Sequence, residues 1–214
     1  MLKTKIKASS ITNLTDARYF AAWEAEWLGF NLDPGTENYV SPATVQAMKE
    51  WVDGVKIVGE FNQQEARDIL TSVDILGLDA VQLGTFASLE TLQALHAKEV
   101  PVLQELVVEE WSDLSALATQ MEARSGLAAY FLLDFAKNGL SWAAAKSNVL
   151  AELRQLAEDF PLLLNLPFPA SEVEEVLEQT GAAGFSVQGG EEEKVGFKSF
   201  DELDDLFEAL EVFE

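Results

Sequence analysis

The 214-residue chain contains no cysteine, which excludes a disulfide framework, a thiolate metal site and a thiol nucleophile. A single histidine, His96, leaves too few nitrogen ligands for a zinc site. No apolar run is long enough to cross a membrane, and the N-terminus has no signal-peptide core. We therefore expect a soluble protein of the cytoplasm that has no membrane partner.

Positive charge is also scarce. Lysine and arginine number 14 against 37 aspartates and glutamates, which gives a formal net charge of -23. A field of this sign opposes nucleic acid, acidic lipid surfaces and, more weakly, phosphorylated metabolites. Two interpretations stay open: a solvated or salt-tolerant acidic surface, and a docking surface for a basic protein partner.

What the chain does contain is a regular alternation of short apolar runs and amphipathic segments. Such runs as "VKIVGEF" and "PLLLNL" are typical of parallel strands that are covered on both faces. The predicted strands are 3–8, 28–32, 55–61, 79–83, 101–107, 129–134, 161–165 and 184–187. The predicted helices are 14–26, 42–52, 63–73, 88–97, 111–124, 141–158, 171–179 and 199–210.

Eight strand–helix units in this length predict a single α/β domain over residues 1–214, a (β/α)₈ TIM barrel with short loops. A doubly wound open sheet is the competing topology, and it is disfavoured because no glycine-rich dinucleotide fingerprint follows the first strand. Residues with side-chain oxygens precede several predicted helices and are candidate N-caps. They are Asn13 or Thr15, Ser41, Ser88, Ser171 and Ser199.

In such a barrel, functional groups lie at the C-terminal ends of the strands. Asp134 ends the run "AAYFLLD", where a partly desolvated carboxylate suits acid–base work, although it could equally cap the following turn. Glu105 interrupts another strand, where a lone glutamate more often finds a basic partner than a substrate. His96 falls at a helix end, remote from this rim. The glutamates of "GGEEEK" lack the ligand spacing of a calcium loop, so we expect no metal.

Four stretches, in their order and spacing, resemble one known family. They are "KIKASSITNLTDA", "LGFNLDPGTENYVSPA", "GLDAVQL" and "VGFKSFDEL". The chain resembles phosphoribosylanthranilate isomerase, a (β/α)₈ barrel of tryptophan biosynthesis that works without a cofactor. The resemblance implies an Amadori rearrangement of N-(5-phosphoribosyl)anthranilate, a cysteine base, an aspartate acid and a phosphate site after strands seven and eight.

The residues that carry this chemistry are largely replaced. The family's opening turn, K-I-C-G-I-T, has Ser9 at the cysteine position and Ser10 at the next glycine. A serine hydroxyl stays protonated unless a base lies beside it, so the resemblance implies a lost base. Asp134 matches the family's acid, but the glycine-rich loop after it is shortened to "FAKNGLSW". Asn38 stands where the family has an arginine for the substrate's anionic groups.

The neighbouring motifs differ as well. In the V-Q-L-H-G segment Gln82 is kept, and Gly84 replaces a common histidine. The strand-seven glycine pair of the phosphate site becomes Leu166 and Pro167, and proline has no N–H to donate. The strand-eight turn keeps its two glycines but adds acidic residues around a glutamate that the family often has. These residues are Gly189, Gly190, Glu191 and Glu193.

The sequence thus predicts a barrel of this family that is degenerate at its active site and binds a different, less anionic small molecule at its C-terminal rim. The polar residues expected to line that mouth are Ser9, Ser10, Asn38, Asp134, Asn165 and Gln188. Two alternatives stay open. One is an active intramolecular isomerase that uses Asp134 with unusual chemistry, and the other is a non-catalytic acidic interaction protein.

Overall fold

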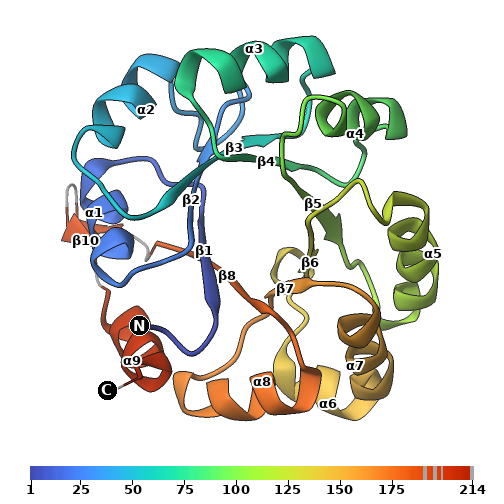
Figure 1. Cartoon of the computed structure of the whole chain (residues 1–214). Helices are drawn as coiled ribbons and strands as arrows, with labels where there is room; N and C mark the ends of the chain where they lie inside the picture. Colours follow the sequence, from blue (N-terminus) through green and yellow to red (C-terminus); the bar gives the residue numbers. More distant parts are fainter. Residues whose placement is uncertain (190–191, 195–196, 199, 213–214) are drawn as a thin grey trace.

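The computed structural model describes residues 1–189, 192–194, 197–198 and 200–212. Eight parallel strands pair in chain order, and β8 returns to pair with β1, so that the sheet closes into a barrel (Figure 1). The strands are β1 (Lys5–Ser9), β2 (Trp27–Asn31), β3 (Lys56–Phe61), β4 (Ala80–Leu83), β5 (Val102–Val107), β6 (Tyr130–Asp134), β7 (Leu162–Asn165) and β8 (Gly184–Gln188). The closure confirms the predicted (β/α)₈ barrel and excludes the doubly wound alternative.

Helices form a ring outside the strands (Figure 1). They are α1 (Leu14–Ala22), α2 (Pro42–Lys49), α3 (Ala66–Leu76), α4 (Leu89–His96), α5 (Leu114–Arg124), α6 (Trp142–Asn148), α7 (Leu150–Asp159), α8 (Val173–Thr180) and α9 (Asp201–Leu210). Short 3₁₀ turns are η1 (Trp111–Asp113), η2 (Ala136–Asn138) and η3 (Ala170–Glu172), and β9 (Glu192–Lys194) pairs antiparallel with β10 (Phe197–Lys198).

One predicted helix, 141–158, is wrong as a single element. Val149 has φ -141° and ψ 16°, which lies outside the helical region and divides the segment into α6 and α7. Val149 is buried, with an exposed fraction of 6%, so its packing against the core stabilises the break. A β-branched residue loses side-chain freedom within a helix, which makes this position a favourable place to interrupt one.

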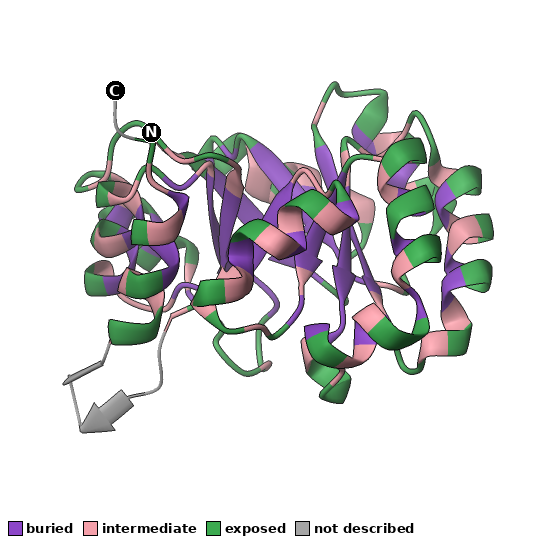
Figure 2. Cartoon of the chain, turned by 90° about the horizontal axis from the view of Figure 1, so that it is seen from below, coloured by how far each residue is buried: buried purple, intermediate pink, exposed green. Residues whose placement is uncertain are grey.

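Two apolar layers hold the barrel together. Inside it, one side chain from each of six strands forms a cluster of Trp27, Val58, Ala80, Leu103, Leu132 and Leu163. The alternate residues of each strand point outward and pack under the helices, whose outer faces are exposed (Figure 2). This two-sided burial explains why the strands read as nearly continuous apolar runs. Among the described residues, no helix combines the length and apolar character needed to cross a membrane.

The predicted caps have mixed outcomes. Asn13 accepts a hydrogen bond from the Asp16 N–H, and Ser41 and Ser88 accept from the N–H groups of Thr44 and Thr91, which confirms those caps. The Ser171 cap is wrong, because that residue lies inside η3. The Ser199 cap lies outside the described residues, and α9 begins after Phe200 without a side-chain cap.

Candidate active site

The C-terminal mouth of the barrel is lined by polar side chains. Paired residues on neighbouring parallel strands face the same side of a sheet, so the register identifies the inward set. Asn31, Glu60 and Gln82 pair in one row across β2, β3 and β4. Asp134 pairs with Asn165, and Ser9 pairs with Gln188. Above the inner apolar cluster the barrel therefore ends in a layer of hydrogen-bonding groups.

A buried ion pair joins β1 and β3 in this layer. Lys7 Nζ on β1 lies 2.6 Å from Glu60 Oε1 on β3, and their side chains are 0% and 6% exposed. Gly29 on the intervening strand β2 makes the pair possible: a Cβ there would lie 2.1 Å from Glu60 Oε1 and 2.8 Å from Lys7 Nζ. Removing one member of such a pair commonly costs about 3–5 kcal/mol, because the other charge is left buried without compensation.

Ser9, at the position of the family's base, is part of the same network. Lys7 Nζ donates to Ser9 Oγ at 2.7 Å, and Ser9 Oγ lies 2.7 Å from Ser186 Oγ on β8. An ammonium group has only hydrogens to offer, so Lys7 cannot accept the proton of Ser9 in this arrangement. Ser9 is thus a hydrogen-bonded hydroxyl beside a cation, and nothing in these contacts activates it as a base.

Ser10 is held in place by the same carboxylate. Its N–H lies 3.2 Å from both Oε1 and Oε2 of Glu60, and its hydroxyl donates to Oε2 at 3.1 Å. Ser10 has φ 53°, a left-handed conformation that is unusual for residues other than glycine. Glu60 therefore fixes the turn between β1 and α1 as well as neutralising Lys7.

A second charged group occupies the β5–β6 side of the mouth. Lys137, from η2, lies 2.6 Å from Glu105 Oε1 and 3.3 Å from Asp134 Oδ2. This confirms the expectation that Glu105 has a basic partner. Asp134 Oδ1 also accepts the Lys137 N–H at 3.0 Å, so Asp134 does cap the following turn.

The surroundings raise the pKa of Glu105 and the pKa of Lys137. Burial raises the pKa of Glu105, and the opposing effect of Lys137 does not cancel it, because Asp134 and Glu60 also lie nearby. For Lys137, burial lowers the pKa, but the carboxylates of Glu105 and Asp134 outweigh it and the net shift is upward. A buried carboxyl with a raised pKa is a candidate for acid–base work, and Lys137 is its ion-pair partner.

The remaining predicted residues of the mouth lie at different depths. Gln82 is buried, and its Oε1 has no hydrogen-bond partner among the described residues. Asn38 lies on the exposed loop between β2 and α2 with φ 59°. At Gly84, a Cβ would lie 2.0 Å from Asn62 Oδ1, so the Asn62 side chain fills the space in front of this glycine.

A cavity of about 1010 Å³ lies where β7 and β8 end beside α9. Asn165, Ser186 and Gln188 line it, as do Leu166 and Pro167. The first turns of α9 contribute three carboxylates, Asp201, Glu202 and Asp205, and none of the described lining residues is basic. Gly189 belongs to the lining, whereas Gly190, Glu191 and the side chain of Glu193 lie outside the described residues. This is the part of the barrel at which the resemblance implies a phosphate site, and its described surface has acidic, uncharged polar and apolar side chains but no basic one.

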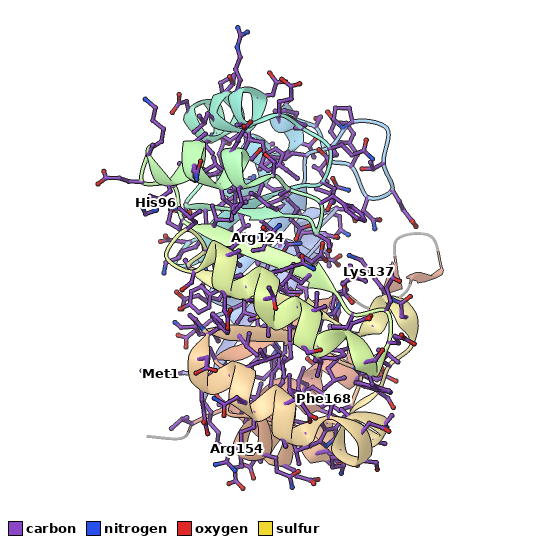
Figure 3. The ribbon with its side chains drawn as sticks, turned by 90° about the vertical axis from the view of Figure 1, so that its right-hand side faces the viewer. Met1, His96, Arg124, Lys137, Arg154 and Phe168 are labelled. Carbon is purple, nitrogen blue, oxygen red and sulfur yellow. The ribbon has the colours of Figure 1, made fainter. Side chains whose placement is uncertain are left out.

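His96 lies far from this rim. It is the last residue of α4, as predicted, and Figure 3 shows it at the end of the molecule that holds Met1, opposite Lys137 and Phe168. Among the described residues, no three aspartates, glutamates or histidines converge as metal ligands.

Comparison with known proteins identifies the family. The family model described as N-(5'phosphoribosyl)anthranilate (PRA) isomerase matches residues 6–209. The chain belongs to this family. It is 27% identical over 214 residues to the N-(5'-phosphoribosyl)anthranilate isomerase of Sinorhizobium medicae, with 98% of each chain covered.

Solved structures agree on the architecture. The phosphoribosylanthranilate isomerase of Thermotoga maritima aligns with a TM-score of 0.77 at 23% identity and covers 97% of this chain and 98% of its own. The enzyme from Thermus thermophilus aligns with a TM-score of 0.72 at 26% identity, covering 96% and 98%. A further isomerase structure, at 22% identity and a TM-score of 0.75, covers 97% and 98% and is a complex with reduced 1-(o-carboxyphenylamino)-1-deoxyribulose 5-phosphate.

Sequence reasoning missed three residues of this site, Lys7, Glu60 and Ser186, and it did not identify Lys137 as the partner of Glu105. A signal for two of them was present, because Lys7 has the same strand parity as Ser9, and Glu60 interrupts the buried run "VKIVGEF". Opposite charges in two buried strands of one barrel indicate a pair. The contact between Ser9 and Ser186 depends on closure between β1 and β8, which only the three-dimensional register supplies.

Proposed function

We propose that this member of the PRA isomerase family does not catalyse the Amadori isomerisation and instead binds a less anionic small molecule at its C-terminal rim. The observation that carries the proposal is the position of Ser9 beside the Lys7 ammonium, 2.7 Å from Nζ. Hydroxyl deprotonation needs a neighbouring acceptor, and Lys7 is a donor that already engages Glu60. The base of the family's reaction therefore has no counterpart at this position.

The cavity beside β7 and β8 supports the same conclusion. A phosphate is normally held by backbone N–H groups and basic side chains. Here Pro167 has no N–H, and Asp201, Glu202 and Asp205 line the cavity. A doubly charged phosphate would meet repulsion from these carboxylates, whereas an uncharged ligand would not.

Turnover of N-(5-phosphoribosyl)anthranilate, followed by loss of its fluorescence, tests the proposal. Wild type and the Ser9→Cys variant are compared at equal concentration after circular dichroism verifies that both are folded. We expect no turnover by wild type above the buffer rate. Inhibition of turnover by inorganic phosphate then cannot be measured, because there is no turnover to inhibit. Wild-type turnover that scales with enzyme concentration would refute the proposal.

Active isomerisation is a second candidate because of one specific contact, the 2.6 Å approach of Lys137 Nζ to Glu105 Oε1 beside Asp134. Asp134 could serve as the acid and Glu105 as the base, although both lie on the β5–β6 side rather than across the mouth. Under this alternative, Glu105→Gln would abolish a measurable wild-type turnover, and Ser9→Ala would leave it intact. The two hypotheses thus differ in both the wild-type result and the sensitive residue.

A further inference from the structure

The ion pair and the two serines form a continuous hydrogen-bonded chain that ends at the cavity. Glu60, Lys7, Ser9 and Ser186 are linked by successive contacts of 2.6, 2.7 and 2.7 Å. As whole residues, side chain and backbone together, Lys7, Glu60 and Ser186 are 0%, 4% and 5% exposed. Ser186 lines the cavity, whereas Lys7, Ser9 and Glu60 do not.

The chemistry of the groups gives this chain a direction. Lys7 can only donate, so the oxygen of Ser9 accepts from it. Ser9 Oγ and Ser186 Oγ lie 2.7 Å apart, and either hydroxyl could donate. Because Ser9 already accepts from Lys7, donation from Ser9 to Ser186 uses the hydrogen of Ser9 and leaves that of Ser186 for an acceptor in the cavity that Ser186 lines. Each donor in such a series polarises the next one, so a buried cation at one end strengthens the donor at the other.

We infer that Ser186 presents a polarised hydroxyl donor to the cavity and holds there an uncharged carbonyl or hydroxyl oxygen of the ligand, with Lys7 and Ser9 as positioning residues. This inference rests on the proposed function and adds a ligand class to it. An acceptor is required because Ser186 donates. An uncharged acceptor is required because Asp201, Glu202 and Asp205 line the same cavity, without a basic side chain among its described residues.

The rest of the cavity wall indicates the body of this ligand. The rings of Phe168 and Phe185 lie 4.9 Å apart at an interplanar angle of 55°, and both line the cavity. Leu203 and Leu206 of α9 also line it. Aromatic and aliphatic walls around a few oriented polar groups are typical of sites for small, partly apolar molecules. The ligand class is therefore an uncharged aromatic or alicyclic compound with a carbonyl or hydroxyl group.

Acetophenone labelled with ¹³C at the carbonyl is a suitable probe, with ethylbenzene as a partner of similar shape that has no acceptor. Binding is measured by saturation-transfer NMR, and the ¹³C shift reports donation to the carbonyl. We expect acetophenone to bind about fivefold to tenfold more tightly than ethylbenzene, as one net hydrogen bond allows. Its carbonyl resonance should move downfield on binding.

Three variants distinguish polarisation through the hydrogen-bonded chain from an effect of packing alone. Ser186→Ala should reduce acetophenone to the affinity of ethylbenzene and abolish the downfield shift. Ser9→Ala, which leaves the cavity lining untouched, should reduce the shift while the probe still binds. Ser115→Ala is the matched control: it removes a hydroxyl from the exposed face of α5, away from both the hydrogen-bonded chain and the cavity, so neither quantity should change.

Several outcomes overturn the inference. Equal binding of acetophenone and ethylbenzene would do so, as would an unchanged ¹³C shift in Ser186→Ala or Ser9→Ala, or no binding of either probe. Titration of the same samples with inorganic phosphate tests the proposed function separately. Phosphate binding that excludes acetophenone would refute the less anionic ligand, and the Ser186 comparison would still be interpretable.

Discussion

Lys7 Nζ donates to Ser9 Oγ across 2.7 Å, two residues apart on the inner face of β1. At the position where the resemblance implies a thiolate, this barrel thus has a hydroxyl and, directly beside it, a cation. A cation stabilises an adjacent anion, so the surroundings that fail to activate a serine would favour a cysteine thiolate. A serine here in place of the cysteine that the resemblance implies is therefore a change of one side chain within a network that still suits an anion.

The first prediction follows from that contact. In Ser9→Cys, the chain's single thiol should have a pKa below its ordinary value of about 8.5, because the Lys7 ammonium stabilises the thiolate. The rate of alkylation by iodoacetamide, measured as a function of pH, reports this pKa directly. Ser147→Cys, at an exposed position within α6, supplies an ordinary thiol as the control. A midpoint for Cys at position 9 that equals or exceeds the control value would contradict the prediction.

The second prediction concerns the space that β2 leaves for the ion pair. Gly29→Ala should lower the free energy of unfolding by about 1–3 kcal/mol, because the new Cβ overlaps Glu60 Oε1 and crowds Lys7 Nζ. Urea unfolding measures the loss. The cost should shrink when Lys7 and Glu60 are both replaced by alanine, since the overlapping atoms are then gone. An equal cost in both backgrounds would show that the glycine is needed for another reason.

These contacts mark how far the sequence could predict the molecule. The barrel follows from local pattern, because strands such as "AYFLLD" and capped helices such as the one after Ser41 specify their own type. The break at Val149 was not visible, because the helical pattern continues through it and tertiary packing decides. Lys137 was missed as a partner of Glu105, because the two lie 32 residues apart and meet only through the register of β5 and β6.

The third prediction uses two carboxyls whose pKa values shift in opposite directions, that of Glu105 upward and that of Glu26 downward. The pKa of Glu105 is raised above 4.5 mainly by burial, so the folded protein holds this proton more tightly than the unfolded chain. Wild type should therefore lose stability relative to Glu105→Gln as the pH rises from about 4.5 through the folded-state pKa, and the difference should then become constant. Urea unfolding of both proteins between about pH 4 and pH 8 measures it.

Glu26 provides the control of opposite sign. Its hydrogen bond with Lys56 lowers the pKa of its carboxyl below 4.5, so the unfolded chain holds this proton more tightly. Wild type should be more stable than Glu26→Gln above about pH 4.5 and should lose that advantage as the pH falls through the folded-state pKa. Pairs of curves that run in the same direction would show that the mutations act through packing rather than through proton binding.

The fourth prediction concerns the net charge of -23, which makes the folded chain repel itself. Raising sodium chloride from about 20 mM to about 500 mM shortens the screening length several-fold and should raise the melting temperature. A gain of about 1 kcal/mol corresponds to roughly 2–4 °C for a domain of this size. Near the sequence isoelectric point of about 4.2 the positive and negative charges balance, so the same salt should then have little effect. A salt response of equal size at both pH values would mean that salt acts through apolar burial, and that the acidic surface costs the fold nothing.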